Sequence, residues 1–249
     1  MTQKVKLLHP IIAIISTGFL LYGQSLFFDY SNFDDNVLIL DNQAYISDFS
    51  NFFDAFKRTV FITGTDVFYR PIETIWFMLN AQVAGSDLFF YHFTSILLHC
   101  IATYLVYVLL KRLHNSEQTS FLLSLIFLVH PLGSQAVAWI PGVVDVLVAV
   151  FSISSFLFFL NFIENKKQKD FLLHILFFAL ALYTKEIAAC IALVCVAYFL
   201  INKHKNGIHT RLIMFVVGWV SVGFIWFAMR QASLDGQNQK HIFEMVASV

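Results

Sequence analysis

The chain has 249 residues, of which 58% are hydrophobic and only 13% are charged, and 29 of them are phenylalanine. A soluble domain carries about 25% charged and about 45–50% apolar residues, so this composition excludes a chain of one or two soluble domains and predicts a membrane protein with several spans. Sixteen basic and sixteen acidic residues balance, so the net charge says nothing about partners. The three cysteines, Cys100, Cys190 and Cys195, all lie in apolar runs, and we interpret them as core residues rather than disulfides or metal ligands.

The first apolar run covers residues 9–27, which is close to the 20 residues or so needed to cross about 30 Å of hydrocarbon. Lys4 and Lys6 precede it and favour a cytoplasmic N-terminus. No small-residue cleavage site follows, so we expect an uncleaved anchor. The sequence then predicts a long first extracytoplasmic loop over residues 28–87.

Two short helices are expected within this loop. Ser47-Asp48, followed by several phenylalanines, predicts a capped short helix with an aromatic face that lies on the membrane surface. Arg70 and Pro71 open a second helix, because proline suits the first helical turn. Its apolar run, residues 72–83, has only about 12 residues, which indicates an interfacial or re-entrant helix rather than a span.

Six further spans are predicted, over residues 88–110, 117–129, 143–162, 171–184, 187–201 and 212–229. The predicted fold class is therefore an all-α polytopic membrane protein with about seven transmembrane helices and interfacial helices in the first loop. Residues 130–141 carry glycine and proline, so we expect this loop to be non-helical or broken. Residues 1–230 form the predicted transmembrane domain, and residues 231–249 are a polar tail that we interpret as the start of a further loop.

The distribution of charge supports this topology. When the predicted spans are counted from a cytoplasmic N-terminus, most of the basic residues fall on the inner side, as the positive-inside rule requires. They are Lys4, Lys6, Lys111, Arg112, Lys166, Lys167, Lys169, Lys203, Lys205 and Arg211. Only Glu117, Glu164 and Asp170 accompany them, and the other acidic residues fall on the outer side, periplasmic or lumenal.

Seven ionisable residues gather on the outer side in this topology. They are Asp34, Asp35, Arg70, His130, Asp145, Lys185 and Glu186. Ionisable groups at membrane depth are costly and usually face a partner or a wet cavity. The pair Asp34-Asp35 suits a general base, a ligand for a divalent cation or a clamp for sugar hydroxyls. Arg70 and Lys185 suit an anionic headgroup, because a guanidinium grips phosphate at two points.

The order of these motifs resembles a known family. Asp34-Asp35 follow the first span, Arg70 precedes a short helix, His130 and Asp145 follow the third span, and Lys185 separates two later spans. This pattern, over about residues 10–205, is similar to the GT-C superfamily of integral-membrane glycosyltransferases. It most resembles the TMTC-type O-mannosyltransferases and their bacterial relatives.

The resemblance implies a polyprenyl-phosphate sugar as donor and a protein or glycan acceptor on the extracytoplasmic side, with inverting displacement at the anomeric carbon. It implies that Asp34 or Asp35 is the catalytic base or holds a divalent cation. Arg70 would contact the lipid phosphate. The cavity would be lined by His130, Asp145, Lys185 and Glu186.

The chain departs from the family pattern after His130-Pro131. In the family, this stretch reads roughly H-T-E-A-V-A-x-x-x-G-R-x-D. Gln135 stands at the glutamate and Val143 at the arginine, whereas Asp145 is kept. A non-catalytic or degenerate module that binds a lipid-linked sugar or scaffolds a complex is therefore the alternative. A small-molecule transporter is a third hypothesis, but the ionisable groups cluster at one face and no inverted repeat is visible.

Overall fold

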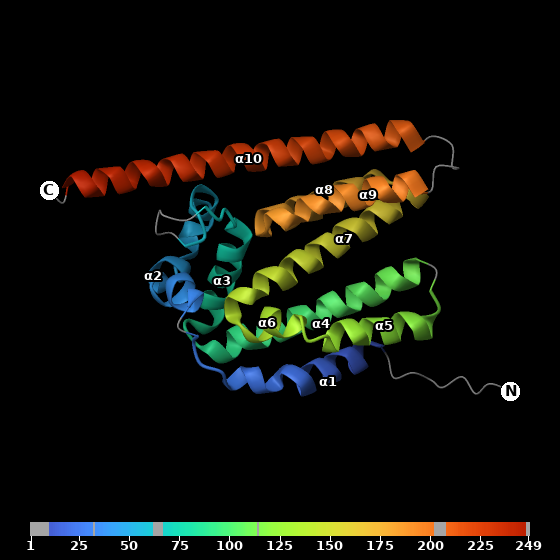
Figure 1. Ribbon diagram of the computed structural model, residues 1–249, viewed down its shortest axis with the longest axis horizontal. Coiled ribbons are helices and arrows are strands. Elements are labelled where there is room, and N and C mark those ends of the chain that lie inside the picture. The colour runs from blue at the N-terminus through green and yellow to red at the C-terminus, as the bar shows by residue number, and fades with distance from the viewer. Residues whose placement is uncertain (1–9, 32, 62–66, 114, 202–207, 248–249) are drawn as a thin grey trace.

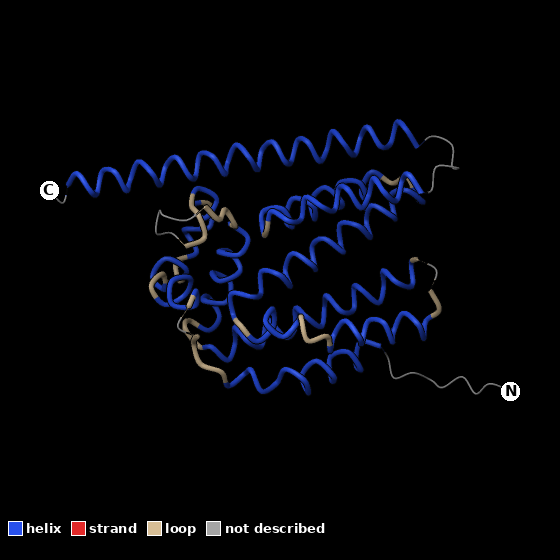
Figure 2. The backbone as a smooth tube through the Cα atoms, in the orientation of Figure 1, coloured by secondary structure: helices blue, strands red, loops and turns tan. Residues whose placement is uncertain are grey.

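The computed structural model describes residues 10–31, 33–61, 67–113, 115–201 and 208–247. Every regular element among these residues is a helix, which confirms the all-α fold class. Figure 2 shows long helices joined by short loops. Each of these helices satisfies its backbone hydrogen bonds internally, as a lipid environment requires.

The described residues include seven helices that lie side by side along the long axis of the molecule (Figure 1). They are α1 (Pro10–Tyr22), α4 (Leu88–Arg112), α5 (Glu117–Val129), α7 (Val143–Asn165), α8 (Gln168–Thr184), α9 (Cys190–Ile201) and α10 (Ile208–Ala247). Because the connections between α7, α8, α9 and α10 are short, these four helices alternate in direction.

The other elements lie mainly at one end of this bundle (Figure 1, left). They are η1 (Gly23–Phe27), η2 (Asn36–Leu40), α2 (Gln43–Ile46), η3 (Phe49–Phe52), η4 (Asp54–Lys57), α3 (Pro71–Ala84), α6 (Gly133–Ala138) and η5 (Ile140–Gly142). A further short turn, η6 (Glu186–Ala189), joins α8 to α9 at the same end. The first loop and α3 therefore form a helical cap on the bundle.

Four helical segments among the described residues are long and apolar enough to cross a membrane. They are Pro10–Phe27, Leu88–Arg112, Ile140–Asn165 and Leu212–Gly236. The prediction of a multi-span membrane protein is thus confirmed, but this count does not reach the predicted seven. The other three predicted spans correspond to α5, α8 and α9, with 13, 17 and 12 residues. At 1.5 Å per residue these helices reach only about 18–26 Å.

Local signals set most helix boundaries where the sequence predicts them. Pro71 occupies the first turn of α3, and α3 ends at Gly85, whose positive φ of 59° suits glycine. The Asp48 carboxylate caps η3 by accepting from the Ser50 N–H at 2.9 Å, although this predicted aromatic helix is a pair of short 3-10 turns. The polar segment over residues 231–247 continues α10 without a break.

Two hydrophobic cores hold the bundle together. The first packs α1, α3, α4, α5 and α7 around Met78, Ile96 and Leu128, and the second packs α7–α10 around Phe159 and Phe215. Cys100 and Cys195 are buried and unpaired, as predicted. Cys190 is also unpaired, but it is exposed at the first residue of α9, so its assignment to the core was wrong.

A buried histidine joins α10 to the second core. The His174 Nδ1–H donates to the Ser155 carbonyl at 2.9 Å, and the Trp219 indole N–H donates to His174 Nε2 at 2.8 Å. Both His174 ring nitrogens therefore have a partner in a fully buried position. This network fixes the position of α10 against α7 and α8, because a displaced helix would leave these polar atoms unpaired in an apolar core.

Replacing Trp219 by phenylalanine is expected to lower the free energy of unfolding by about 1 kcal/mol, because it leaves His174 Nε2 buried without a donor. Thermal unfolding in detergent micelles measures this loss. Trp226→Phe is the matched control, because the buried Trp226 indole N–H has no hydrogen-bond partner among the described residues. An equal loss of stability in both variants would mean that indole volume, not the hydrogen bond, holds α10.

Candidate functional site

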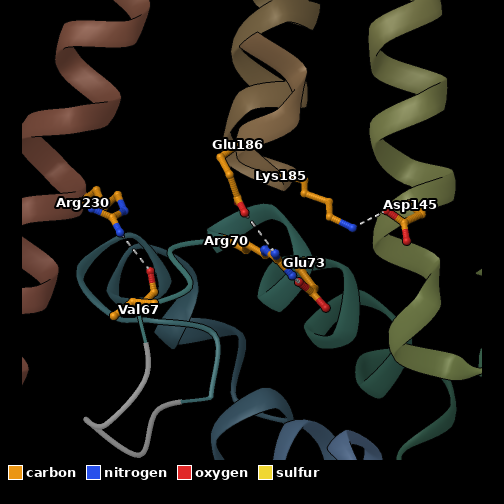
Figure 3. Close-up of polar contacts among 7 residues, drawn as sticks. All are labelled: Val67, Arg70, Glu73, Asp145, Lys185, Glu186 and Arg230. Atoms are coloured by element: carbon orange, nitrogen blue, oxygen red, sulfur yellow. Dashed lines mark hydrogen bonds and ion pairs between the residues drawn. The ribbon is translucent and has the colours of Figure 1, made fainter. Parts of the chain in front are cut away.

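Four of the predicted site residues meet at the capped end of the bundle (Figure 3). Arg70 directly precedes α3, Asp145 lies in the first turn of α7, and Lys185 and Glu186 connect α8 to α9. Arg70 Nη2 lies 3.3 Å from Glu186 Oε1, and Lys185 Nζ pairs with Asp145 Oδ1. These two ion pairs join the connection between α8 and α9 to the start of α3 and to the start of α7, and we call them the ion-pair cluster.

The backbone at Lys185 explains how two neighbouring residues reach different partners. Lys185 ends α8 in an extended conformation, with φ −158° and ψ 133°, before η6 begins at Glu186. Side chains of adjacent residues in extended backbone point to opposite sides. Lys185 therefore points toward α7, whereas Glu186 points toward α3 and Arg70 (Figure 3). This confirms the predicted break between α8 and α9 at Lys185-Glu186.

Glu73 is a member of this site that the sequence analysis missed. It lies one turn after Arg70 in α3, is only 2% exposed, and its Oε2 is 3.8 Å from Arg70 Nη1. Burial raises the pKa of Glu73 to about 8, although the charges of Arg70 and Lys185 act to lower it. An arginine and a glutamate three residues apart share a helix face, and that spacing was the signal available in the sequence.

The two carboxyl groups beside Arg70 differ in protonation. Burial acts to raise the pKa of Glu186, but a backbone hydrogen bond and the Arg70 guanidinium outweigh it, so the pKa is below its ordinary value. The Glu186 side chain is 50% exposed and carries its charge at neutral pH. Glu73, with its raised pKa, holds a proton at the same pH. Arg70 therefore has one charged partner and one neutral neighbour.

Asp34 and Asp35 have different surroundings, although they are adjacent. Asp35 is 2% exposed, and its Oδ2 accepts from the Ser31 N–H at 2.7 Å and from the Ser31 hydroxyl at 2.8 Å. The Trp139 indole N–H donates to the same Ser31 hydroxyl at 3.1 Å. Asp35 thus ties the first loop to the segment after α6.

Asp34 is half-buried, and its negative charge acts to raise the pKa of Glu73, so it lies within electrostatic reach of the ion-pair cluster. Side chains of adjacent helical residues do not face each other, and this separates Asp34 from Asp35. The described residues contain no group of three or more histidine, cysteine, aspartate or glutamate side chains placed to hold a metal ion.

A cleft of about 360 Å³ opens beside the ion-pair cluster. Its polar lining residues are His99, His130 and Asp145, and α6 and α7 supply most of the rest. His130 is exposed, and its Nδ1 accepts from the Leu132 N–H at 3.3 Å. Asp145 belongs to both the cleft and the ion-pair cluster, so it connects His130 with the charged residues.

The two positions that depart from the family pattern have opposite environments. Gln135 is exposed on α6, whereas Val143 is fully buried at the start of α7. Between them, Gly142 packs directly on α6, because a Cβ built there would lie 2.5 Å from the Gln135 carbonyl oxygen. This close approach sets where α7 begins and therefore where Asp145 points.

Gly142→Ala is expected to lower the free energy of unfolding by about 1–3 kcal/mol and to displace Asp145, because backbone atoms of α6 must move to admit the methyl group. Thermal unfolding of the purified variant measures the loss. Gly223→Ala is the control, because no atom lies within 4 Å of a Cβ at that position in α10. Alanine there is expected to be neutral or stabilising, since glycine is a poor helix former. Equal stability of both variants would show that α6 can shift without cost.

Comparison with known proteins agrees with the resemblance. A family model described as dolichyl-phosphate-mannose-protein mannosyltransferase matches residues 70–232, which include the whole ion-pair cluster. Protein O-mannosyl-transferase TMTC1 of Homo sapiens is 32% identical over 162 residues, which cover 56% of this chain and 18% of the human protein. Protein O-mannosyl-transferase F38B6.6 of Caenorhabditis elegans is 27% identical over 210 residues, which cover 82% of this chain and 29% of the nematode protein.

Protein O-mannosyl-transferase tmtc2 of Xenopus laevis is 33% identical over 148 residues, or 58% of this chain and 18% of the frog protein. The chain thus spans less than a third of the length of these curated relatives. No solved structure matches it. Because the family model covers well over half of the chain, the chain belongs to the dolichyl-phosphate-mannose-protein mannosyltransferase family.

Proposed function

We propose that this chain is the membrane part of a glycosyltransferase that moves a mannose-like sugar from a polyprenyl-phosphate carrier to a hydroxyl group of a protein acceptor. The ion-pair cluster is the observation that carries this proposal. Two cations, Arg70 and Lys185, pair with the carboxylates of Glu186 and Asp145 at one end of an apolar bundle, and the charge of Asp34 acts on the neighbouring Glu73. Such an end can bind an anionic headgroup while the lipid tail stays in the hydrocarbon.

Each residue of the site has a distinct role in this proposal. Arg70 binds the donor phosphate, since its planar guanidinium can donate two parallel hydrogen bonds, and Lys185 adds a second positive charge. The acceptor oxygen attacks the anomeric carbon as the bond from that carbon to the phosphate oxygen breaks, with inversion. Asp34 takes the proton of the acceptor hydroxyl, and the lipid phosphate leaves with its negative charge stabilised by Arg70.

We further propose seven crossings, with the N-terminus in the cytoplasm and the site on the periplasmic or lumenal side. The end of the bundle opposite the cluster carries Lys111 and Arg112, which pair with Glu117 and Glu164. A basic end of this kind is typical of the cytoplasmic side. The short helices α5, α8 and α9 would then cross with local thinning of the bilayer. Four further inner basic residues, Lys4, Lys6, Lys203 and Lys205, lie outside the described residues.

A module that binds the lipid-linked sugar without transferring it is the second candidate. The observation that favours it is the replacement of a charged pair of the family pattern by Gln135 and Val143. Val143 is fully buried, so no charged side chain of this position reaches the cleft. The site would then keep Arg70 and Lys185 for the phosphate but lack part of the acceptor-binding face.

The test is a transfer assay with the purified chain in liposomes, labelled polyprenyl-phosphate mannose and a serine- and threonine-rich peptide. We expect label on the peptide, and a parallel reaction with a chelator tests for a divalent cation. Lys111→Gln, at the opposite end of the bundle, is expected to transfer as well as the wild type. Donor binding without transfer would favour the non-catalytic module. If the chain neither binds the donor nor transfers the sugar, both candidate functions are overturned.

A further inference from the structure

Glu73 and Arg70 leave two buried polar atoms without partners. Glu73 Oε2 and Arg70 Nε are both enclosed, and neither has a hydrogen-bond partner among the described residues. A buried polar atom that makes no hydrogen bond costs about 1–3 kcal/mol, so folded proteins usually avoid one. A structural ion pair would bring these groups into hydrogen-bond contact, but the nearest approach between Glu73 Oε2 and Arg70 Nη1 is 3.8 Å. Glu73 and Arg70 therefore lie next to each other, but Glu73 Oε2 makes no hydrogen bond to the guanidinium.

We propose that Glu73 is a positioning residue for a phosphate anion, which acts by holding Arg70 in place and by carrying a proton whenever the anion is bound. This inference rests on the proposed function and adds a residue and a proton to it. The ligand chemistry is an isoprenyl phosphate. Glu73 does not touch the reacting atoms in this scheme, and it acts only through Arg70.

The charges around Glu73 explain why its proton matters. Arg70 and Lys185 supply two positive charges, whereas Asp145 and Asp34 supply two negative ones. An ionised Glu73 would add a further negative charge, beyond those of Asp145, Asp34 and Glu186, 3.8 Å from the guanidinium and compete with phosphate for it. A protonated Glu73 removes that competitor and keeps the same shape, so Arg70 stays in position and is free to bind the anion.

Glu186, on the other side of Arg70, cannot do the same. Its side chain is 50% exposed, and its pKa is lowered, so it stays charged and is screened by solvent. Glu73 is enclosed, and its charge acts on Arg70 through a medium of low polarity. Of the two carboxyl groups at Arg70, only Glu73 can change its charge near neutral pH.

Linkage sets the direction of the effect. A bound anion on Arg70 removes the positive charge that favours ionised Glu73, so binding raises the pKa of Glu73 above about 8 and takes up a proton. Below pH 8 the carboxyl is already protonated, and affinity is at its maximum. Above pH 8 Glu73 is mostly ionised in the free protein, so binding requires Glu73 to take up a proton from solvent. The affinity then falls by up to about tenfold per pH unit.

The experiment measures binding of farnesyl phosphate to the full chain in detergent between about pH 7.5 and about pH 9.5, where the ligand is almost fully ionised. For the wild type we expect constant affinity up to about pH 8 and a fall above it. Glu73→Gln keeps the shape and is always neutral, so its affinity is expected to remain flat at the low-pH value. Glu117→Gln, at the opposite end of the bundle, is the control and should behave as the wild type. A flat wild-type profile, or the same fall in Glu73→Gln, would overturn the proposal.

Calorimetry in two buffers of different ionisation enthalpy provides a second measurement that needs no variant. Uptake approaching one proton per farnesyl phosphate at pH 8–9, where the free ligand is fully ionised, supports the proposal, and none contradicts it. Inorganic phosphate and phosphatidylglycerol vesicles are run in parallel. Equal proton uptake with phosphatidylglycerol would mean that the anion is a bilayer headgroup, which overturns the isoprenyl assignment. The transfer assay is independent, since a proton-linked site without transfer leaves this inference standing while the catalytic function fails.

Discussion

Asp34→Asn is expected to lower the rate of sugar transfer by about 10²–10⁴-fold and to leave stability and donor affinity nearly unchanged. Asparagine keeps the volume and the polar oxygen of aspartate, but it cannot act as the base that takes the proton of the acceptor hydroxyl. Asp34 is half-buried, and its charge acts on Glu73 beside the ion-pair cluster, so of the adjacent pair it is the carboxylate that we propose as the base. The measurement is kcat in the transfer assay at saturating donor.

Asp35→Asn is the matched control, and its expected effect is on folding. The Asp35 carboxylate accepts two hydrogen bonds from Ser31 in a buried position, so losing its charge should cost about 1–3 kcal/mol of unfolding free energy. Material that remains folded should retain most of its transfer rate. If Asp35→Asn abolishes transfer in folded protein while Asp34→Asn does not, the assignment of the base to Asp34 is wrong.

The parts of the structure that sequence could predict are those set by neighbouring residues. Pro71 starts α3, Gly85 ends it with a positive φ, and Glu117 starts α5 after the capping residue Ser116. Each depends on the conformational preference of one residue or on one local hydrogen bond. The break at Lys185 was visible for the same reason, because two apolar runs meet there at a charged pair.

The parts that could not be predicted depend on contacts between distant residues. Arg70 and Glu186 are 116 positions apart, and nothing in the sequence pairs them. Glu73 was overlooked because a single carboxyl in an apolar helix is normally expected to be exposed at the surface. In the structure, α3 packs against α8 and Glu73 is buried. The predicted seven spans exceed the four helical segments that are long enough to cross by themselves, because apolar runs of 12–17 residues were each counted as a crossing.

Those distant contacts also explain why one end of the bundle is suited to anions. The start of α3 contributes the Arg70 guanidinium, while the start of α7 and the end of α8 contribute the Asp145–Lys185 pair. Each cation already has a carboxylate partner, so the cluster is nearly neutral without ligand and remains stable in a poorly hydrated place. A bound phosphate can then exchange with an exposed carboxylate such as Glu186, which returns to solvent at little cost.

Arg70→Lys is expected to weaken donor binding by about 10–100-fold with a smaller effect on kcat. Lysine keeps the positive charge but loses the planar guanidinium, so one of two charge-assisted hydrogen bonds to phosphate is lost, which costs about 1.5–3 kcal/mol. The shorter reach of a single ammonium group also leaves Glu73 buried without the cation beside it. The measurement is the dependence of the transfer rate on donor concentration.

Arg230→Lys is the control for this change, because it removes a second guanidinium at the same end of the bundle. Arg230 Nη2 donates to the Val67 carbonyl at 3.3 Å from α10 and makes no ion pair with the cluster (Figure 3). A lysine there can keep one such hydrogen bond, so donor affinity is expected to stay within about twofold of the wild type. Equal losses of affinity in both variants would mean that the general positive potential of this end, rather than the geometry of Arg70, binds the phosphate.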